Sequence, residues 1–238
     1  MKKALIAAAV LFVCTTSSFA RLGKPEIVIK GSLQLPSALE EDGTGYVSNG
    51  YDTFSLDERE WRNLLPNFAF ALESYIYNKT FAFGMGVNQQ LSKKYESESD
   101  AEFSFTSVYF TAKKIITPSE EDVSLYILGQ LGMSFMQHNF KYIYGRALPD
   151  IKTDPGYYVA AGMGIHFGNV IVELTGSLNW AKLSMDGTVD GVKTVAEIIE
   201  RNWNFNFNIG YRFKLTHETP KIKNDTNNPL SERRTRGK

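Results

Sequence analysis

The feature that most constrains the fold is a strict alternation of polar and apolar residues. It is clearest in 202–215, where every second residue is aromatic or aliphatic. Successive side chains of a β-strand point to opposite faces, so this alternation predicts strands with one apolar and one polar face. Runs of this kind predict eight strands: 25–35, 65–77, 80–91, 103–114, 123–137, 157–167, 170–182 and 202–215. In the fourth run the apolar phase slips between Phe105 and Val108, which predicts a bulge.

The N-terminal segment has the pattern of a secretory signal peptide. Lys2 and Lys3 precede an apolar stretch that is too short to span a bilayer, and Ser18-Phe19-Ala20 has the small residues of a cleavage site. We therefore expect residues 1–20 to be removed near Ala20, rather than retained as an anchor. The single cysteine, Cys14, lies in this segment, so no disulfide is expected in the mature chain. Cleavage leaves 24 basic against 26 acidic residues, which does not indicate a nucleic-acid partner.

The connections between the predicted strands alternate between short and long. The short ones are 78–79, 115–122 and 168–169, and the long ones are 36–64, 92–102, 138–156 and 183–201. An even number of strands, with both chain ends on the side of the short connections, is typical of bacterial outer-membrane barrels. The expected fold for 21–215 is all-β: an eight-stranded antiparallel up-and-down transmembrane β-barrel, with short periplasmic turns and longer extracellular loops. Residues 216–238 are expected to form a polar, basic and disordered periplasmic tail.

A soluble barrel such as a lipocalin shares the strand number and the alternation, but the composition of the two faces favours a membrane barrel. One face is aromatic and aliphatic, and the other is rich in alanine and glycine, which suits a narrow lumen. Aromatic residues also collect near the strand ends, as in the interfacial girdles of membrane proteins. The predicted girdle comprises Trp61, Trp180, Trp203 and Tyr157 at the outer end, and Phe81, Phe167, Tyr211 and Phe213 at the inner end.

The last predicted strand ends in a recognisable motif. The run Asn208-Ile209-Gly210-Tyr211-Arg212-Phe213-Lys214-Leu215 resembles the β-signal that the outer-membrane assembly machinery reads in a last strand. It is also similar to the Gly-Tyr-Arg-Phe ending of OmpX-like barrels, although those chains usually stop at the aromatic residue. Together with the architecture, the motif resembles the OmpA/OmpX-like eight-stranded outer-membrane β-barrels. The resemblance implies location in the bacterial outer membrane and an assembly signal formed by Asn208, Gly210, Phe213 and Leu215.

Charged residues fall on the face that is predicted to line the lumen. Lys30, Glu73, Glu173 and Arg212 lie near the short-turn end, on strands that become neighbours when the barrel closes. Buried opposite charges must pair to offset their desolvation. We therefore expect an interior polar network of Lys30, Glu73, Glu173, Arg212, His166 and Tyr126. Eight strands leave room only for side chains, which favours a structural plug over the alternative, a path for solutes or protons.

The sequence does not indicate a catalytic site. A lipid A-modifying enzyme with this architecture needs a nucleophile, a base and an orienting group together. Ser134 and His138 are four residues apart, which on a strand is about 13 Å, and the His-x-Ser spacing of the deacylase family is absent. We expect no enzyme activity, no metal site and no cofactor.

The fold alone does not define the function, so three hypotheses stay open. The first is a structural or surface-interaction role, in adhesion or envelope integrity. Its expected partners are outer-membrane lipids, lipopolysaccharide, the assembly machinery and host or surface proteins. The second is a narrow channel for small or apolar solutes in the manner of OmpW-like barrels, and the third is a lipid A-modifying enzyme. The acidic connection 36–64 is expected to be a solvated loop, with cation bridges to lipopolysaccharide as the alternative.

The last two predicted strands are expected to continue above the membrane. Residues 182–188 and 192–201 are compatible with strands, and Asp186-Gly187 or Asp190-Gly191 would make a tight turn. We expect a protruding hairpin, as in OmpX-like barrels, with an exposed edge that can pair with an extended strand of another protein. The alternative is a short helix over 194–200, which its alanine and glutamates favour.

Overall fold

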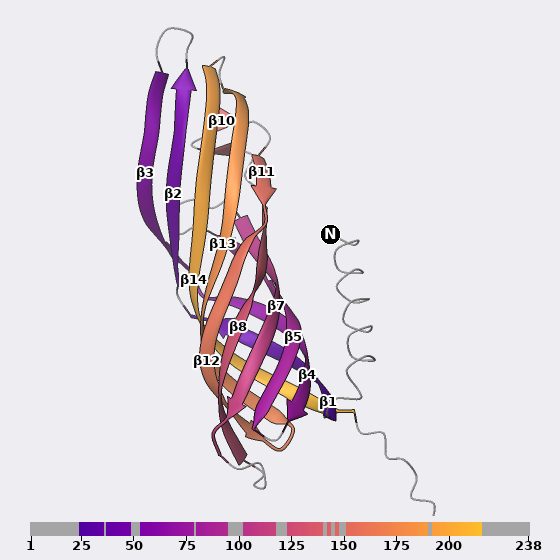
Figure 1. Cartoon of the computed structure of the whole chain (residues 1–238). Helices are drawn as coiled ribbons and strands as arrows, with labels where there is room; N and C mark the ends of the chain where they lie inside the picture. Colours follow the sequence, from indigo (N-terminus) through magenta and orange to yellow (C-terminus); the bar gives the residue numbers. More distant parts are fainter. Residues whose placement is uncertain are drawn as a thin grey trace, which may run out of the picture.

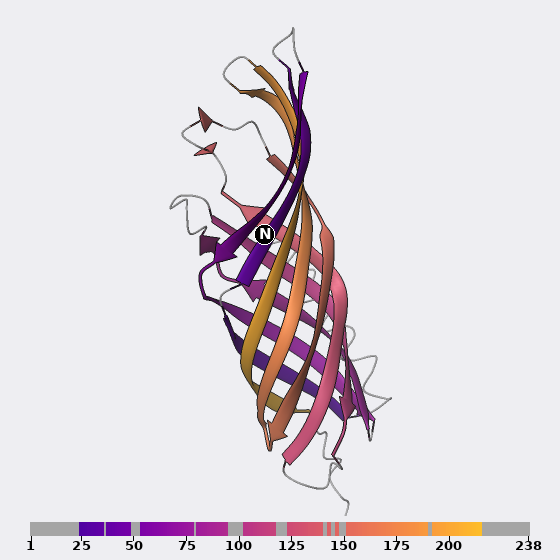
Figure 2. The same cartoon turned by 90° about the vertical axis from the view of Figure 1, so that its left-hand side faces the viewer.

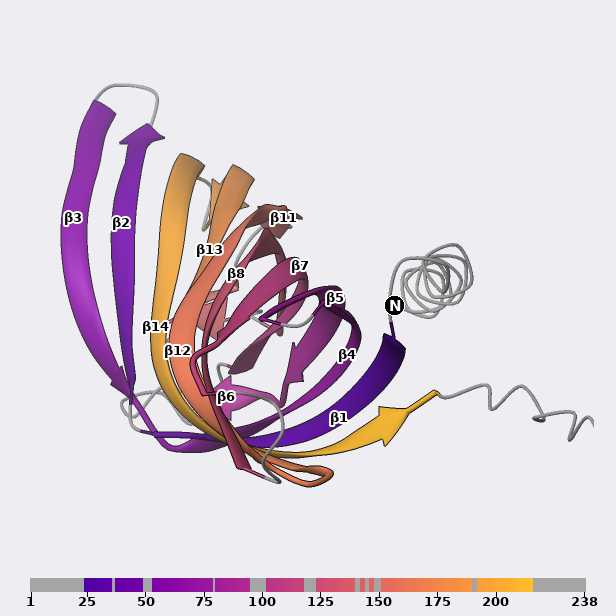
Figure 3. The ribbon, with the colours of Figure 1, turned by 60° about the horizontal axis from the view of Figure 1, so that its bottom comes forward.

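Eight long strands form a closed antiparallel ring (Figures 1 and 3). The computed structural model describes residues 24–35, 37–48, 53–78, 80–94, 102–117, 123–139, 142–143, 146–147, 151–189 and 192–215. The ring runs β1 (Lys24–Gln34), β4 (Asn67–Asn78), β5 (Phe81–Gln90), β7 (Glu102–Ile115), β8 (Val123–His138), β12 (Gly156–Phe167), β13 (Val170–Val189) and β14 (Val192–Lys214). Pairing of β14 with both β13 and β1 closes it. The predicted eight-stranded up-and-down architecture is confirmed.

Two predicted segments lie outside the described residues: the signal peptide, 1–20, and the tail, 216–238. Among the residues that the structure does describe, no helix is long and apolar enough to cross a membrane.

Strand β7 is regular throughout, so the predicted bulge between Phe105 and Val108 is wrong. Its pairing with β8 runs in one register from Phe103 to Ile115, and its pairing with β5 runs in one register from Thr106 to Lys114. The apolar phase slips in the sequence because Phe103 and Phe105 point into the barrel, where at most 1% of either is exposed. Below them, Val108 and Phe110 point outward. Apolar residues thus occupy both faces of one strand at different heights.

A five-stranded sheet, which we call the blade, rises from the outer end of the ring (Figures 1 and 2). Its order is β11 (Ile151–Asp154), β13, β14, β2 (Ser37–Ser48) and β3 (Thr53–Leu64). The pairing of β13 with β14 continues up to Val189 and Val192. The predicted hairpin is therefore confirmed, and the alternative helix over 194–200 is wrong. The connection at 190–191 lies outside the described residues.

The expectation that 36–64 is a solvated loop is wrong, because most of it is β2 and β3. Strand β2 pairs with β14 from Ala38 opposite Trp203 to Ser48 opposite Lys193, and β3 pairs with β2. Acidic residues are depleted in strands, which hid this hairpin in the sequence. Strand β2 forms although its strand propensity is low, because it pairs with the hydrogen-bonding edge of β14. The edge of β14 that we expected to be exposed is therefore covered by β2, and β3 is the outermost strand of the blade on this side.

Short elements complete the two ends of the barrel. At the outer end, β6 (Lys93–Lys94) pairs with β7, and β9 (Tyr142–Ile143) pairs with β10 (Arg146–Ala147). At the inner end, Gly168-Asn169 joins β12 to β13, with Gly168 at a φ of 56°. Glycine adopts this left-handed conformation without steric cost, which permits so tight a turn.

The outer surface of the ring is a continuous apolar band. Its side chains include Phe110, which is 70% exposed, and Phe205, which is 67% exposed. Only a lipid surrounding removes so much apolar surface from water, so the ring is a membrane-spanning barrel. Of the predicted girdle, the Tyr157 and Trp180 rings lie 5.1 Å apart near the outer end, and the Tyr211 and Phe213 rings lie 4.8 Å apart near the inner end. Trp61 is on β3, and its side chain lies outside the described part of the structure.

Candidate functional site

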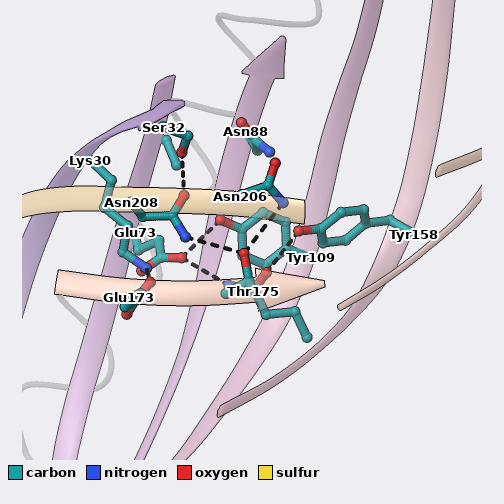
Figure 4. A pocket seen from close by; sticks show the side chains of 12 residues that line it. Lys30, Ser32, Glu73, Asn88, Tyr109, Tyr158, Glu173, Thr175, Asn206 and Asn208 are labelled. Atoms are coloured by element: carbon teal, nitrogen blue, oxygen red, sulfur yellow. Dashed lines mark hydrogen bonds and ion pairs between the residues drawn. The ribbon is translucent and has the colours of Figure 1, made fainter. Parts of the chain in front are cut away.

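Two lysines and two glutamates meet in the lumen: Lys30 on β1, Glu73 on β4, Lys113 on β7 and Glu173 on β13. We call this set the charged layer. Lys30 Nζ lies 2.6 Å from Glu73 Oε2 and 2.5 Å from Glu173 Oε2 (Figure 4), and Lys113 Nζ lies 2.8 Å from Glu173 Oε1. At most 3% of any of the four residues is exposed. Two positive and two negative charges leave the layer neutral, which offsets the desolvation that each ion pays.

Three tyrosine hydroxyls complete the coordination of the two carboxylates. Tyr75 donates to Glu73 Oε2 at 2.6 Å, and Tyr109 donates to Glu73 Oε1 at 2.8 Å. Tyr126 donates to Glu173 Oε1 at 2.7 Å. Hydrogen bonds to a charged acceptor are roughly twice as strong as neutral ones. The tyrosines therefore stabilise both carboxylates and hold them in one position.

Glycine at two inward positions makes room for these side chains. A Cβ atom at Gly86 would lie 2.8 Å from both Glu73 Cγ and the Tyr109 ring, and one at Gly164 would lie 2.5 Å from the Tyr126 hydroxyl. The sequence indicates the alternating glycines of β5 and β12 only as small lumen residues. In the structure their missing side chains leave the space that the charged layer fills.

The structure brings four of the six predicted network residues together and places the other two lower. Lys30, Glu73, Glu173 and Tyr126 are joined by the contacts above. Arg212 instead lies 3.6 Å from Glu26 and donates to the Gly168 carbonyl at 2.7 Å, so it sits at a lower level than the charged layer. His166 Nδ1 is 3.4 Å from Arg212 Nη1, and its ring centroid is 4.4 Å from that of Tyr126. His166 thus links the two levels by ring contact.

Lys113 is the member that sequence reasoning missed. The apolar phase slips along its strand, 103–114, because the inward phenylalanines obscure which face is polar. Below them the run Tyr109, Thr111 and Lys113 keeps period two, and this was the available signal. In the structure the Lys113 ammonium also lies 4.2 Å from the centroid of the Tyr75 ring and 4.6 Å from that of Tyr126, which adds cation–π stabilisation.

A small polar cavity adjoins the charged layer on its outer side (Figure 4). Its lining includes Lys30, Glu73, Glu173, Asn88, Tyr109, Tyr158 and Asn206. A water-sized sphere can occupy about 20 Å³ of it, which is room for a water molecule. The cavity is too small for an organic solute in this conformation.

The outer end of the lumen is filled by a hydrophobic cluster that we call the outer cap. It consists of Leu39, Leu64, Phe103, Phe105, Met136, Ala181 and Leu183, and none of these residues is more than 4% exposed. The Phe103 and Phe105 rings pack edge to face with their centroids 5.9 Å apart. Leu39 and Leu64 come from β2 and β3, so the base of the blade forms part of the cap.

Of Ser134 and His138, Ser134 points into the lumen and not toward lipid. Ser134 is fully buried on the lumen side, where its hydroxyl donates to Asn179 Oδ1 at 3.3 Å. Asn139 Oδ1 accepts a hydrogen bond from the backbone N–H of Glu102 at 2.7 Å. Within the described ranges no group of three or more His, Cys, Asp or Glu residues could hold a metal ion.

The predicted assembly signal occupies the end of β14 that pairs with β1. Gly210 lies opposite Lys30, Phe213 lies opposite Ile27, and the N–H of Leu215 donates to the Pro25 carbonyl at 3.0 Å. Asn208 faces the lumen and accepts a hydrogen bond from the Ser32 hydroxyl. Phe213 faces outward and is 45% exposed. Its recognition by the assembly machinery stays a prediction.

A membrane-spanning ring of eight antiparallel strands, with its polar residues inside and short turns at one end, is the fold of the eight-stranded outer-membrane β-barrels. Among solved structures, OprG from Pseudomonas aeruginosa is similar at a TM-score of 0.50 and 12% identity, over 80% of this chain and 97% of that one. Neisserial surface protein A has a TM-score of 0.39 and 12% identity, over 79% and 97% of the two chains. Ail from Yersinia pestis has a TM-score of 0.38 and 20% identity, over 81% and 100%.

Sequence comparison adds nothing to this fold-level similarity. No protein-family model matches the sequence, and no curated protein matches it. At the identities found among the solved structures, the similarity shows the fold alone.

Proposed function

We propose that this protein is a bacterial outer-membrane barrel that anchors the blade as an interaction surface, with a non-enzymatic role in adhesion or envelope integrity. The observation that carries this proposal is the continuation of β13 and β14 beyond the barrel, where β2, β3 and β11 join them. The lumen beneath holds a neutral charged layer and a hydrophobic cap, which suits an anchor better than an open pore. The N-terminal signal pattern and the predicted assembly signal support export to the outer membrane.

The outward face of the blade supports contact with polar partners. Arg201 Nη1 lies 3.0 Å from Glu40 Oε1, and Arg201 Nη2 lies 3.4 Å from Asp42 Oδ2, across the junction of β14 with β2. Lys182 and Glu197 pair at 2.9 Å across β13 and β14. Cross-strand ion pairs of this kind stabilise a sheet that faces water. The partners proposed for this surface are lipopolysaccharide and proteins of a host or of the cell surface.

Shortening the hairpin of β2 and β3 should distinguish the contribution of the blade from that of the barrel. We expect replacement of 42–59 by a two-residue turn to leave barrel assembly intact, because Leu39 and Leu64 of the outer cap remain. Attachment of expressing cells to surfaces, or resistance of the envelope to dyes, should fall to the level of a strain without the gene. The measurements are attachment counts, dye uptake and heat-modifiable mobility on gels. Wild-type attachment and wild-type permeability in the shortened variant would contradict the proposal.

A narrow channel is the second candidate, favoured by the polar cavity inside the lumen. The planar-bilayer conductance of the purified protein separates the two candidates. Steady discrete openings of the wild type would favour a channel, and a silent bilayer supports the anchor. For the enzyme alternative, lipid A from cells with and without the protein should have the same mass spectrum.

A further inference from the structure

Six amide side chains between the charged layer and the outer cap have buried atoms without a hydrogen-bond partner. We call this region the amide chamber. Four of these atoms are acceptor oxygens, on Gln34, Asn88, Asn202 and Asn206, and three are donor nitrogens, on Gln34, Gln90 and Asn179. Asn179 and Asn202 are fully buried, and Gln34 and Gln90 are each 1% exposed. A buried polar group without a hydrogen-bond partner loses the hydration that it had in the unfolded chain, so seven such atoms in one region favour binding of a partner that both donates and accepts.

The position of the chamber follows from the inward residues of β7. Going outward along this strand, they are Lys113 of the charged layer, Thr111, Tyr109, Ser107 and then Phe105 of the outer cap. The Ser107 hydroxyl donates to Asn179 Oδ1 at 2.7 Å, which fixes the height of the amides. On β8, Met136 of the cap follows Ser134, which donates to the same oxygen. The chamber therefore lies directly beneath the hydrophobic cap.

The chemistry of the chamber selects an uncharged guest. The unpartnered atoms include both donors and acceptors, so a carboxylate would face oxygens and a metal ion would face N–H groups. Lys93 and Glu200, two charged residues of opposite sign, are buried as well, at 3% and 2% exposure. The Lys93 ammonium, on β6, donates to Asn204 Oδ1 at 2.5 Å.

We propose that the amide chamber is a binding site for water and for small uncharged polyhydroxylated solutes, and that the outer cap controls access to it. Hydroxyl groups both donate and accept, as the unpartnered amides require. In the present conformation the adjoining cavity has room for a water molecule only. A dry apolar constriction excludes polar solutes, so a larger guest enters when the cap moves. Leu39 and Leu64 of the cap belong to the blade hairpin, and this couples access to the position of the blade.

The first test uses the wild-type protein in detergent micelles. We expect the side-chain N–H groups of Gln34, Gln90 and Asn179 to show magnetisation transfer with water in NMR spectra, because their free donors point into a hydrated space. The ring protons of Phe103 and Phe105 should show none. Absence of water contacts at all three amides would mean that the chamber is dry, and would overturn the proposal.

The second test removes the barrier. Phe105→Ala opens the outer cap, and Phe110→Ala on the same strand truncates a lipid-facing ring as the control. With glycerol as the probe, we expect saturable shifts of the Asn179 and Asn202 side-chain signals in Phe105→Ala and no shift in Phe110→Ala. A folded Phe105→Ala variant that glycerol leaves unchanged would overturn the assignment of the chamber and its gate. If Phe105→Ala does not fold, Phe103→Ala, which truncates the other ring of the same cap, takes its place in the glycerol experiment.

The proposal for the amide chamber and the proposed anchoring function can be disproved independently. Loss of cell attachment in the shortened-hairpin variant concerns the blade, whereas the two NMR tests concern the lumen. A wet chamber in a protein without adhesive function would keep this inference and remove the proposed function.

Discussion

Replacing Glu173 by alanine is expected to lower the free energy of unfolding by about 3–5 kcal/mol, the usual cost of removing one partner from a buried ion pair. Glu173 binds both lysines of the charged layer, at 2.5 and 2.8 Å, and is 1% exposed. Without it, Glu73 is the single carboxylate left to compensate two buried ammonium groups. Urea unfolding in lipid vesicles, followed by tryptophan fluorescence or gel mobility, measures the change.

Glu197 is the matched control, because it pairs with Lys182 at 2.9 Å but is 56% exposed. Exposed ion pairs contribute about 0–1 kcal/mol, so Glu197→Ala should leave the urea midpoint nearly unchanged. Glu40 is unsuitable as a control, since it is 3% exposed and bound to Arg201. Equal midpoints for the Glu173 and Glu197 variants would show that Glu173 is solvated.

The double variant Glu173→Ala with Lys113→Met tests whether charge compensation is the cause. It leaves Lys30 and Glu73, which form a neutral pair at 2.6 Å. We expect it to be more stable than Glu173→Ala alone. A double variant that is no more stable would attribute the loss to packing or to the hydrogen bond from Tyr126.

Phe213→Ala is expected to reduce the amount of folded barrel in the outer membrane severalfold. The predicted cause is loss of recognition by the assembly machinery. Phe213 is 45% exposed to lipid, and its ring contact with Tyr211 accounts for only about 0.5–1.5 kcal/mol. Unfolded chain should collect in the periplasm, where fractionation and gels that separate folded from unfolded barrels detect it.

Phe205→Ala is the control for the assembly effect. Phe205 lies on the same strand and the same face, is 67% exposed, and stands outside the motif. We expect this variant to assemble at wild-type abundance. Normal abundance and normal heat-modifiable mobility of Phe213→Ala would instead show that Phe213 is an ordinary lipid-facing residue.

The inward and outward faces of most barrel strands were predictable from the sequence. Alternation is a local property: on β12, for example, Tyr157, Val159 and Met163 point out while Gly162, Gly164 and His166 point in. Prediction failed on β7, where Phe103 and Phe105 sit inside the outer cap. The period of a strand shows that its two faces differ, but not which face meets lipid once the chain rises above the membrane.

The membership of the charged layer was decided by the tertiary structure. In a closed barrel the strands are tilted, so hydrogen-bonded rows climb around the lumen and residues in one row differ in height. This stagger brings Lys113 from the opposite wall to Glu173, and leaves Arg212 lower, beside Glu26 and the turn at Gly168. The sequence could predict which charged residues face the lumen, but not which of them contact one another.

The sequence by itself determined that this chain folds as long strands with one apolar and one polar face, because strand alternation is a short-range consequence of backbone geometry. It also determined the protruding hairpin of β13 and β14, through strand pattern and turn residues that are contiguous in the chain. Only the tertiary structure decided that the acidic stretch 36–64 is β2 and β3, and that their base helps to seal the lumen. The pairing edge of β14 and the cap residues of β7, β8 and β13 are distant in sequence, and such contacts form only when the barrel closes.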